Sequence, residues 1–491
     1  MKKALAMALG AMLVAGAAAP AFAASQIDFK GYYRIHQMNN WNQTFESVDD
    51  NKSSDDFYFI NRLNMEFTFN ATDDVAVYWR FWAPGAARWG DGRGTVATKW
   101  AYGEAKTDAG TFSIGHLSDN FQCIGLADLG HSLTAVADGG IWGSASPFDW
   151  DADMDGARWA KAWDNGFQLV AQFTRASTEA KLQHSLEMGN TDLYILEPAY
   201  LWDGGGATLA LIYQNDHASG GPTYAKNKTA WDNKGAGPAD VPAAKSYFIN
   251  PAVSHSFGDY TVNFEGKAGW GSQDESWEKD TESIKETGYA FYLDFDYNYG
   301  PGNVTLAGWW ASGSTDEDMS ASGNPKFKGL VDMGSFAPFL VAYGGLANNG
   351  WDRASTVRNA AGDDPVTAIS VANEINSFSG NGNANHWVLA LTGAHAFTDD
   401  VTLKYGLGYL SLNKVDKFKF DSSGNPTTAK AKKDIGYEAD LGVDVQLLDS
   451  LKFTSGFGYL VAGKALETVD ASGKKSKEDA YNWYNTLTFS F

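Results

Sequence analysis

Cysteine is almost absent from this chain of 491 residues, in which Cys123 is the single example. One cysteine excludes an internal disulfide and any metal site built from several thiolates. Basic residues are also few relative to acidic ones, and the formal net charge of −21 argues against nucleic-acid binding. Beyond residue 23 no run of 18 or more apolar residues occurs, which excludes a transmembrane helix in the rest of the chain.

The first 23 residues have the three parts of a secretory signal peptide. These are Lys2 with Lys3, the apolar run from Ala4 to Ala19, and the small-residue pattern Ala21-Phe22-Ala23. Cleavage after residue 23 is predicted to leave 491 − 23 = 468 residues, with 24–491 forming one domain of net charge −23. An exported chain without such helices can cross a membrane only as a closed β-barrel, because lipid offers no partner for backbone polar groups.

Apolar and polar residues alternate along most of the chain, in the pattern of strands with two different faces. The last segment sets Trp483, Asn485, Leu487, Phe489 and Phe491 against Tyr484, Thr486, Thr488 and Ser490. Between residues 435 and 447, Glu438, Asp440 and Asp444 occupy alternate positions opposite apolar neighbours. Acidic side chains at this spacing cannot lie in a dry core, so one face must meet water and the other lipid.

Eighteen segments show this alternation, and the links between them alternate in length. Short turns rich in Asp, Gly and Asn occur at 71–74, 108–110, 164–166, 203–206, 258–259, 300–302, 398–400 and 449–450. The predicted fold is all-β: a transmembrane antiparallel barrel of 18 strands with long external loops, short periplasmic turns and both termini on the periplasmic side. Sixteen strands remain an alternative, because the long external loop 313–385 contains apolar stretches and the segment 98–106 has weak sidedness.

Two parts of the sequence resemble bacterial outer-membrane trimeric porins. Phe489 and the terminal Phe491 resemble the signal read by the barrel-assembly machinery. Phe112-Ser113-Ile114-Gly115-His116, followed by Gly125-Leu126-Ala127-Asp128, resembles the entry to the loop that narrows the pore in general porins, although His116 stands where arginine is common. The suspected match is the homotrimeric porin family of sulfate-reducing bacteria. The resemblance implies a homotrimer in the bacterial outer membrane, in contact with its lipid and lipopolysaccharide, with one loop folded into the lumen.

The link 118–155 is the predicted constriction loop, since it is rich in aspartate and has no Lys or Arg. Its candidate pore residues are Asp119, Asp128, Asp138, Asp149, Asp151 and Asp153. Facing them we expect the basic wall residues Arg34, Arg62, Arg80 and Arg158. Opposed charges would create a transverse field that sorts ions, and the acidic surplus predicts a cation-preferring pore. The alternative is that these arginines only neutralise carboxylates of the lumen.

Two motifs point to other chemistry. Asp151 to Gly156 matches the start of an EF-hand calcium loop, but position twelve is Ala162 where a bidentate glutamate is needed. No cofactor is therefore expected, and only loose calcium binding stays open. His116 and Ser118 lie on one face of a strand, as in an outer-membrane phospholipase. That activity is a remote alternative, and the sequence predicts no enzyme.

Aromatic residues leave a third possibility open, since 18 Trp occur and Tyr32, Tyr58, Tyr78 and Trp82 fall on polar faces. An aromatic slide of this kind would suit an 18-stranded saccharide-selective channel. Most aromatics, however, fall on the lipid-facing register, where girdles at the membrane surface explain them. The sequence therefore favours passive diffusion of small hydrophilic solutes and ions. By resemblance, copies are expected to meet at the first and last strands, and the arm 83–95 to latch onto a neighbouring copy.

Overall fold

The computed structural model describes residues 26–41, 56–83, 96–117, 154–177, 190–216, 244–273, 284–313, 326–327, 357–358, 365–366, 385–415, 432–469 and 475–491. Eighteen long strands make up the wall: β1 (Gln26–Trp41), β2 (Asp56–Asn70), β3 (Val75–Ala83), β4 (Ala97–Thr107), β5 (Gly110–Leu117), β6 (Met154–Ala162), β7 (Phe167–Ser177), β8 (Asn190–Trp202), β9 (Gly205–Asp216), β10 (Ala244–Phe257), β11 (Tyr260–Gln273), β12 (Ile284–Asn298), β13 (Gly302–Ala311), β17 (His386–Ala396), β18 (Val401–Leu412), β19 (Asp434–Leu448), β20 (Leu451–Ala462) and β23 (Ala480–Ser490). In these ranges no helix is long and apolar enough to cross a membrane.

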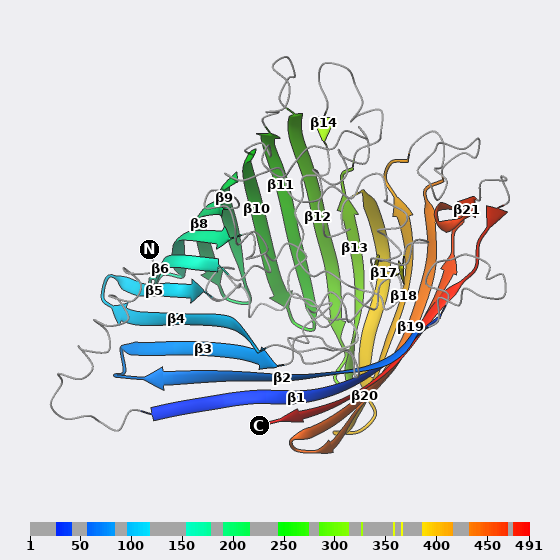
Figure 1. The fold of residues 1–491 in the computed structure, drawn as a ribbon, viewed down its shortest axis with the longest axis horizontal. Coiled ribbons are helices and arrows are strands. Elements are labelled where there is room, and N and C mark those ends of the chain that lie inside the picture. Colours follow the sequence, from blue (N-terminus) through cyan, green and yellow to red (C-terminus); the bar gives the residue numbers. More distant parts are fainter. Residues whose placement is uncertain are drawn as a thin grey trace.

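Each wall strand pairs antiparallel with the next, and the ring closes where β23 pairs with β1 (Figure 1). At this seam Tyr33 lies opposite Phe489. The backbone N–H of Gly31 donates to the carbonyl of Phe491 over 2.8 Å, and the N–H of Phe491 donates back over 3.0 Å. The structure therefore confirms a closed barrel of 18 strands without an open sheet edge.

All eight predicted short turns join consecutive wall strands at one end of the barrel. Gly204, Gly258 and Gly300 adopt the left-handed φ values of 76°, 65° and 87° that tight turns of this kind need. The nine longer links connect strand ends at the other end of the barrel. β13 pairs directly with β17, so the link between them adds no long strand to the described wall. Its short pieces are β14 (Lys326–Phe327), β15 (Val357–Arg358) and β16 (Pro365–Val366), and residues 336–343 lie outside the described ranges.

The two faces of the wall differ as the alternation predicts. Outward-facing Leu407 and Leu441 are 56% and 53% exposed, whereas inward-facing Asp294 and Glu438 are fully buried inside the barrel. Large apolar side chains are stable in such exposure only where lipid covers them. The wall is therefore built to cross a membrane.

Aromatic rings form two belts on the outward face. Near the long links, the centroids of Tyr194 and Tyr213 are 5.8 Å apart, and those of Tyr213 and Tyr247 are 4.9 Å apart. Near the short turns, the rings of Tyr260 and Tyr297 stack at 4.8 Å. Two such belts are typical of transmembrane barrels, in which they lie at the two membrane surfaces.

A β-bulge between β3 and β4 explains the weak sidedness of residues 98–106. The register shifts between Arg80 and Phe81, so that Arg80 lies opposite Trp100 while Phe81 lies opposite Thr98. Thr98 faces outward, where its hydroxyl accepts a hydrogen bond from the indole of Trp79 over 3.4 Å. In a regular strand Thr98 and Trp100, two residues apart, would lie on the same face. The bulge inserts one residue between them, so they lie on opposite faces.

Candidate functional site: the charge-divided lumen

One side of the lumen carries three arginines on adjacent strands. Arg34 on β1 and Arg62 on β2 are direct register partners, and both are almost completely buried. Like charges placed opposite one another on a sheet repel. Part of the compensation is a cation–π contact, since the guanidinium of Arg34 lies 4.5 Å from the ring centre of Tyr32.

Arg80 completes this basic wall on β3. Its Nε donates to the side-chain oxygen of Asn64 over 2.7 Å, and its guanidinium lies 4.5 Å from the ring centre of Trp100. The amide of Asn64 also donates to the hydroxyl of Tyr32 over 3.2 Å. The predicted residues Arg34, Arg62 and Arg80 are thus brought together, within a network of amides and rings that fixes their orientation.

Arg158 lies apart from the other three, on β6. Its Nε donates to the side-chain oxygen of Gln172 over 2.7 Å. Three strand spacings separate β6 from β3, which is roughly 14 Å along the wall. Between them lies Glu104, which accepts a hydrogen bond from Ser113 over 3.3 Å. The four predicted basic residues therefore form one cluster of three and one separate position.

The opposite side of the lumen carries buried carboxylates on β8, β11 and β12. Glu197 accepts a hydrogen bond from Thr208 over 2.8 Å. Asp294 is fully buried and accepts hydrogen bonds from Asn263 over 2.9 Å and from the hydroxyl of Tyr292 over 2.5 Å. Lys267 is also buried on the inward face of β11. The carboxylates Glu197, Glu265, Asp294 and Asp296 outnumber it, so this acidic wall keeps a net negative charge.

A third charged patch lies on the inward face of β18 to β20. Lys404 forms an ion pair with Asp444 over 2.8 Å, and Lys452 lies 3.8 Å from the same carboxylate. The hydroxyl of Thr454 donates to Asp444 over 2.8 Å. Here two lysines offset the charge of Asp444 directly.

The basic and acidic walls face each other across the barrel. Arg62 on β2 and Glu265 on β11 are nine strands apart in a ring of eighteen, and each is buried. A barrel of this size is roughly 35 Å across between backbones. The two walls therefore impose a field transverse to the axis, strongest where side chains narrow the water-filled space.

The predicted constriction aspartates, Asp119, Asp128, Asp138, Asp149, Asp151 and Asp153, all lie outside the described residues. Asp155, expected at the end of the loop, is already part of β6. Its carboxylate faces outward and pairs with Nδ1 of His116 over 3.0 Å. The predicted loop boundary at 155 is therefore wrong, because strand pairing with β5 and β7 begins at 154 and 155.

The structure describes only some of the other residues that the sequence singled out. Ser118, the arm 84–95 and the first 25 residues lie outside the described residues. The side chains of Tyr58 and Trp82 do as well, whereas Tyr32 and Tyr78 face the lumen as expected. Phe489 and Phe491 face outward at the seam, and their role as an assembly signal stays a prediction.

Sequence reasoning did not single out Glu197 or Glu265. On β8 the inward positions include Leu193 and Ile195, and the outward ones include Tyr194 and Leu196. Both faces are therefore apolar near the external end, and the alternation gives no sidedness there. A carboxylate beside Pro198 on an otherwise apolar strand was the signal that could have revealed Glu197.

Neither a known protein-family profile nor any curated protein sequence matches this chain. Solved structures with similar folds include OprD of Pseudomonas aeruginosa (10% identity, 96% of this chain and 97% of that chain, TM-score 0.47). Others are an anion-selective porin from Comamonas acidovorans (11%, 95% and 100%, TM-score 0.44) and OmpT, an outer membrane protein of Vibrio cholerae (10%, 96% and 99%, TM-score 0.38). Structural similarity at such low sequence identity does not assign the chain to a family. Membership of the porin family of sulfate-reducing bacteria therefore stays a prediction.

Proposed function

We propose that this chain is an outer-membrane porin that passes small hydrophilic solutes and ions by diffusion. The observation that carries the proposal is the closed wall, which is apolar outside and charged inside. A wall of this kind crosses lipid and encloses a polar space. The separation of charge within the lumen supports a role in sorting solutes by charge and dipole.

The lumen favours a general channel over a saccharide slide. Trp309, Tyr292 and Tyr484 face inward but are at most 2% exposed, so they offer no open ring face to a sugar. The half-exposed inward rings of Tyr78 and Tyr102 stack on each other at 5.0 Å. A slide needs a continuous series of open rings, and the described part of the lumen supplies a short patch.

Single-channel recording in planar bilayers tests the proposal. We expect an ohmic conductance that falls as solutes become larger and that maltooligosaccharides do not block at low concentration. Current block by low concentrations of these sugars would favour the saccharide channel instead. Absence of any conductance from correctly folded protein would refute the porin.

We further propose that cation preference arises from the aspartates of the link 118–153. Among the described residues, inward-facing acidic and basic side chains are comparable in number, so the wall alone gives little preference. The link adds acidic residues with no Lys or Arg. Replacing Asp119, Asp128, Asp138, Asp149, Asp151 and Asp153 with Asn should therefore shift the reversal potential under a salt gradient toward anions. An unchanged reversal potential would contradict this source of selectivity.

We propose that copies meet at the wall β20–β23–β1–β2, as a homotrimer. Polar side chains interrupt its apolar outward face: the amide of Asn485 lies 3.5 Å from the side-chain oxygen of Gln37, and Asn61 donates to the hydroxyl of Tyr33 over 3.1 Å. Polar amides are costly to expose to lipid, whereas a neighbouring copy offers them a polar surface to pack against.

Unheated gel electrophoresis combined with crosslinking tests this interface. Gln37→Arg should convert the oligomer to a folded monomer, because it places a charge where copies pack. Ala439→Arg, on the outward face of β19 but away from the polar patch, is the matched control and should leave the oligomer intact. A monomeric wild-type protein would refute the assembly.

A further inference from the structure

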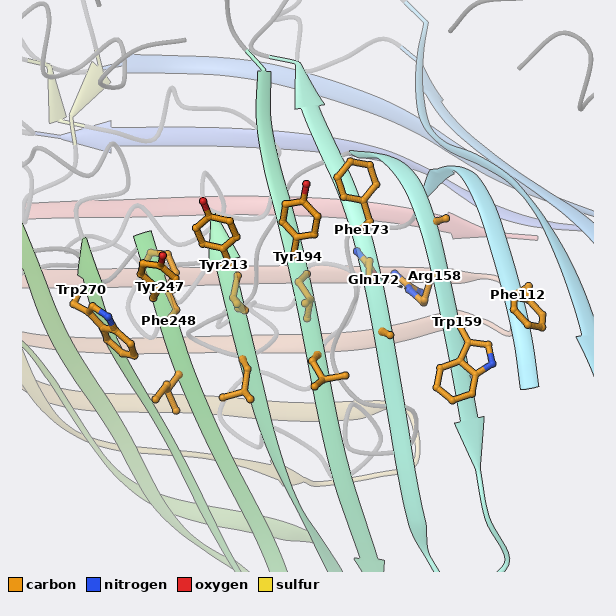
Figure 2. A pocket seen from close by; sticks show the side chains of 17 residues that line it. Phe112, Arg158, Trp159, Gln172, Phe173, Tyr194, Tyr213, Tyr247, Phe248 and Trp270 are labelled. Atoms are coloured by element: carbon orange, nitrogen blue, oxygen red, sulfur yellow. Dashed lines mark hydrogen bonds between the residues drawn. The ribbon is translucent and has the colours of Figure 1, made fainter. Parts of the chain in front are cut away.

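A groove hollows the outward face of the barrel between β5 and β11. It has a volume of about 740 Å³ and lies where the small residues Ala157 and Ala171 interrupt rows of larger side chains. Figure 2 shows the rings of Phe173, Tyr194 and Tyr213 standing side by side along it. These rings belong to the aromatic belt near the long links. The groove therefore reaches from the external membrane surface into the hydrocarbon layer.

The outward-facing side chains on the floor of the groove are apolar, while the inward-facing Arg158 and Gln172 also border it. One row below the aromatic belt, Ala171 lies opposite Leu196, which lies opposite Leu211, which in turn lies opposite Ile249. Trp159 closes this row on the side of β5, as Figure 2 shows. A long, shallow hollow lined by aliphatic side chains fits a hydrocarbon chain.

A row of charged and polar residues crosses the same strands one position further toward the external end. Arg175 donates two hydrogen bonds to the carboxylate of Asp192, of 2.5 and 2.8 Å, which fix this pair on the outward face. Along the row, Lys245 and Lys285 are both exposed and both lie opposite Ser272. Two strand spacings place these lysines roughly 10 Å apart, so both can reach one phosphate group.

We propose that this groove is a binding site for a phosphorylated lipid of the outer leaflet, lipopolysaccharide. An acyl chain would occupy the groove, and a phosphate of the headgroup would lie between Lys245 and Lys285. The aromatic belt fixes the depth of the site. The groove extends from the belt down among the acyl chains, and the lysines lie above the belt among headgroups. The site requires that the barrel sits in the outer membrane, as the proposed function states.

A second copy of the chain fits this groove less well. The proposed interface between copies lies about half a turn around the barrel, on β20, β23, β1 and β2. That wall has polar amides on its outward face, whereas the outward-facing side chains on the floor of the groove are apolar. The outward-facing charged groups beside the groove are instead gathered at its external end, in the arrangement of a lipid with one anionic end.

The test uses the full mature chain, refolded from inclusion bodies in detergent and therefore free of lipopolysaccharide. Purified lipopolysaccharide is titrated against it, and bound lipid is counted by native mass spectrometry. Lys245→Glu combined with Lys285→Glu should weaken binding at least tenfold. Lys161→Glu is the matched control, because Lys161 also faces outward but lies at the periplasmic end of β6, and it should leave binding unchanged.

The groove itself is tested by filling it. Ala171→Phe should weaken lipopolysaccharide binding at least tenfold, whereas Ala439→Phe, outward-facing on β19, should not. Where a charge reversal prevents folding, Lys245→Gln with Lys285→Gln replaces it. Heat-modifiable gel mobility reports folding for every variant.

Three results would overturn the proposal. They are unchanged affinity in both the lysine and Ala171 variants, equal binding of dephosphorylated lipopolysaccharide, and inorganic phosphate binding as strongly as the lipid. Conductance is recorded on the same samples and should match wild type, since all these side chains face outward. Lipid binding without conductance would refute the porin and leave the lipid site standing, so the two failures are distinguishable.

Discussion

Gly308 offers a direct test of which face of the wall meets lipid. It lies on the outward face of β13, between Leu293 and Leu389 on the neighbouring strands and between Leu306 and Trp310 along its own. A Cβ built at this glycine meets no atom within 4 Å. Substitution here therefore changes the transfer of a side chain into lipid and leaves packing within the barrel undisturbed.

The expected magnitude follows from this position, about midway between the two aromatic belts. Arginine near the midplane of a transmembrane barrel costs about 2–4 kcal/mol. Gly308→Arg should thus unfold more readily than Gly308→Leu by roughly 30- to 1,000-fold in the equilibrium constant. Leucine serves as the control because it changes size and removes the glycine without adding charge.

The assay is reversible urea unfolding in lipid vesicles, followed by tryptophan fluorescence. Both variants should give a single transition with similar slopes, displaced from each other by the difference in free energy. Equal stability of the two variants, within about 0.5 kcal/mol, would mean that water covers this face. The assignment of the outward face of the wall to lipid would then be wrong.

Three further outcomes are expected. Arg62→Gln removes one charge of the basic wall and should raise the ratio of cation to anion permeability roughly twofold in bilayer recordings, and an opposite shift would contradict the field described above. Gly31→Ala should destabilise the barrel by about 1–3 kcal/mol in urea unfolding, because its Cβ would clash with the backbone carbonyl oxygen of Asn64 on the neighbouring strand β2, whereas Gly308→Ala should have little effect. Lys404→Met should cost about 1–3 kcal/mol by leaving Asp444 underpaired, and adding Asp444→Asn should recover most of that loss; without recovery, the ion pair is not the cause.

The wall was predictable because its local signals agree with one another. Each short turn has residues that tolerate tight backbone geometry, and each strand repeats with a period of two, so the turns and strand faces follow from sequence. The last strand is the clearest case: the predicted alternation of Trp483 to Phe491 is found in the structure, with Tyr484 and Thr486 buried inside. Glu438 and Asp440 face inward on β19, as their spacing requires.

The charge pattern of the lumen was harder to foresee because it depends on which strands are opposite. Arg62 and Glu265 are 203 positions apart in sequence and become opposed only through closure of the ring. The bulge at Arg80 and Phe81 was also not predictable from the sequence. It exchanges the inward and outward positions of β4, and no proline or glycine marks it. Asp155 was misplaced because a run of alternating aspartates suggests a loop, whereas pairing with His116 makes it part of a strand.

Because β1 and β23 pair like any other neighbouring strands, the ring of strands could in principle begin at a different strand. Gly31 and Phe491 are joined by the same reciprocal bonds as any other neighbours, and β1 continues a few residues beyond the end of β23 on the turn side. A short peptide linking the two ends should therefore allow new termini to be opened in any long link. Such circularly permuted barrels would present their ends on the cell surface, which is the arrangement needed to display a fused peptide there.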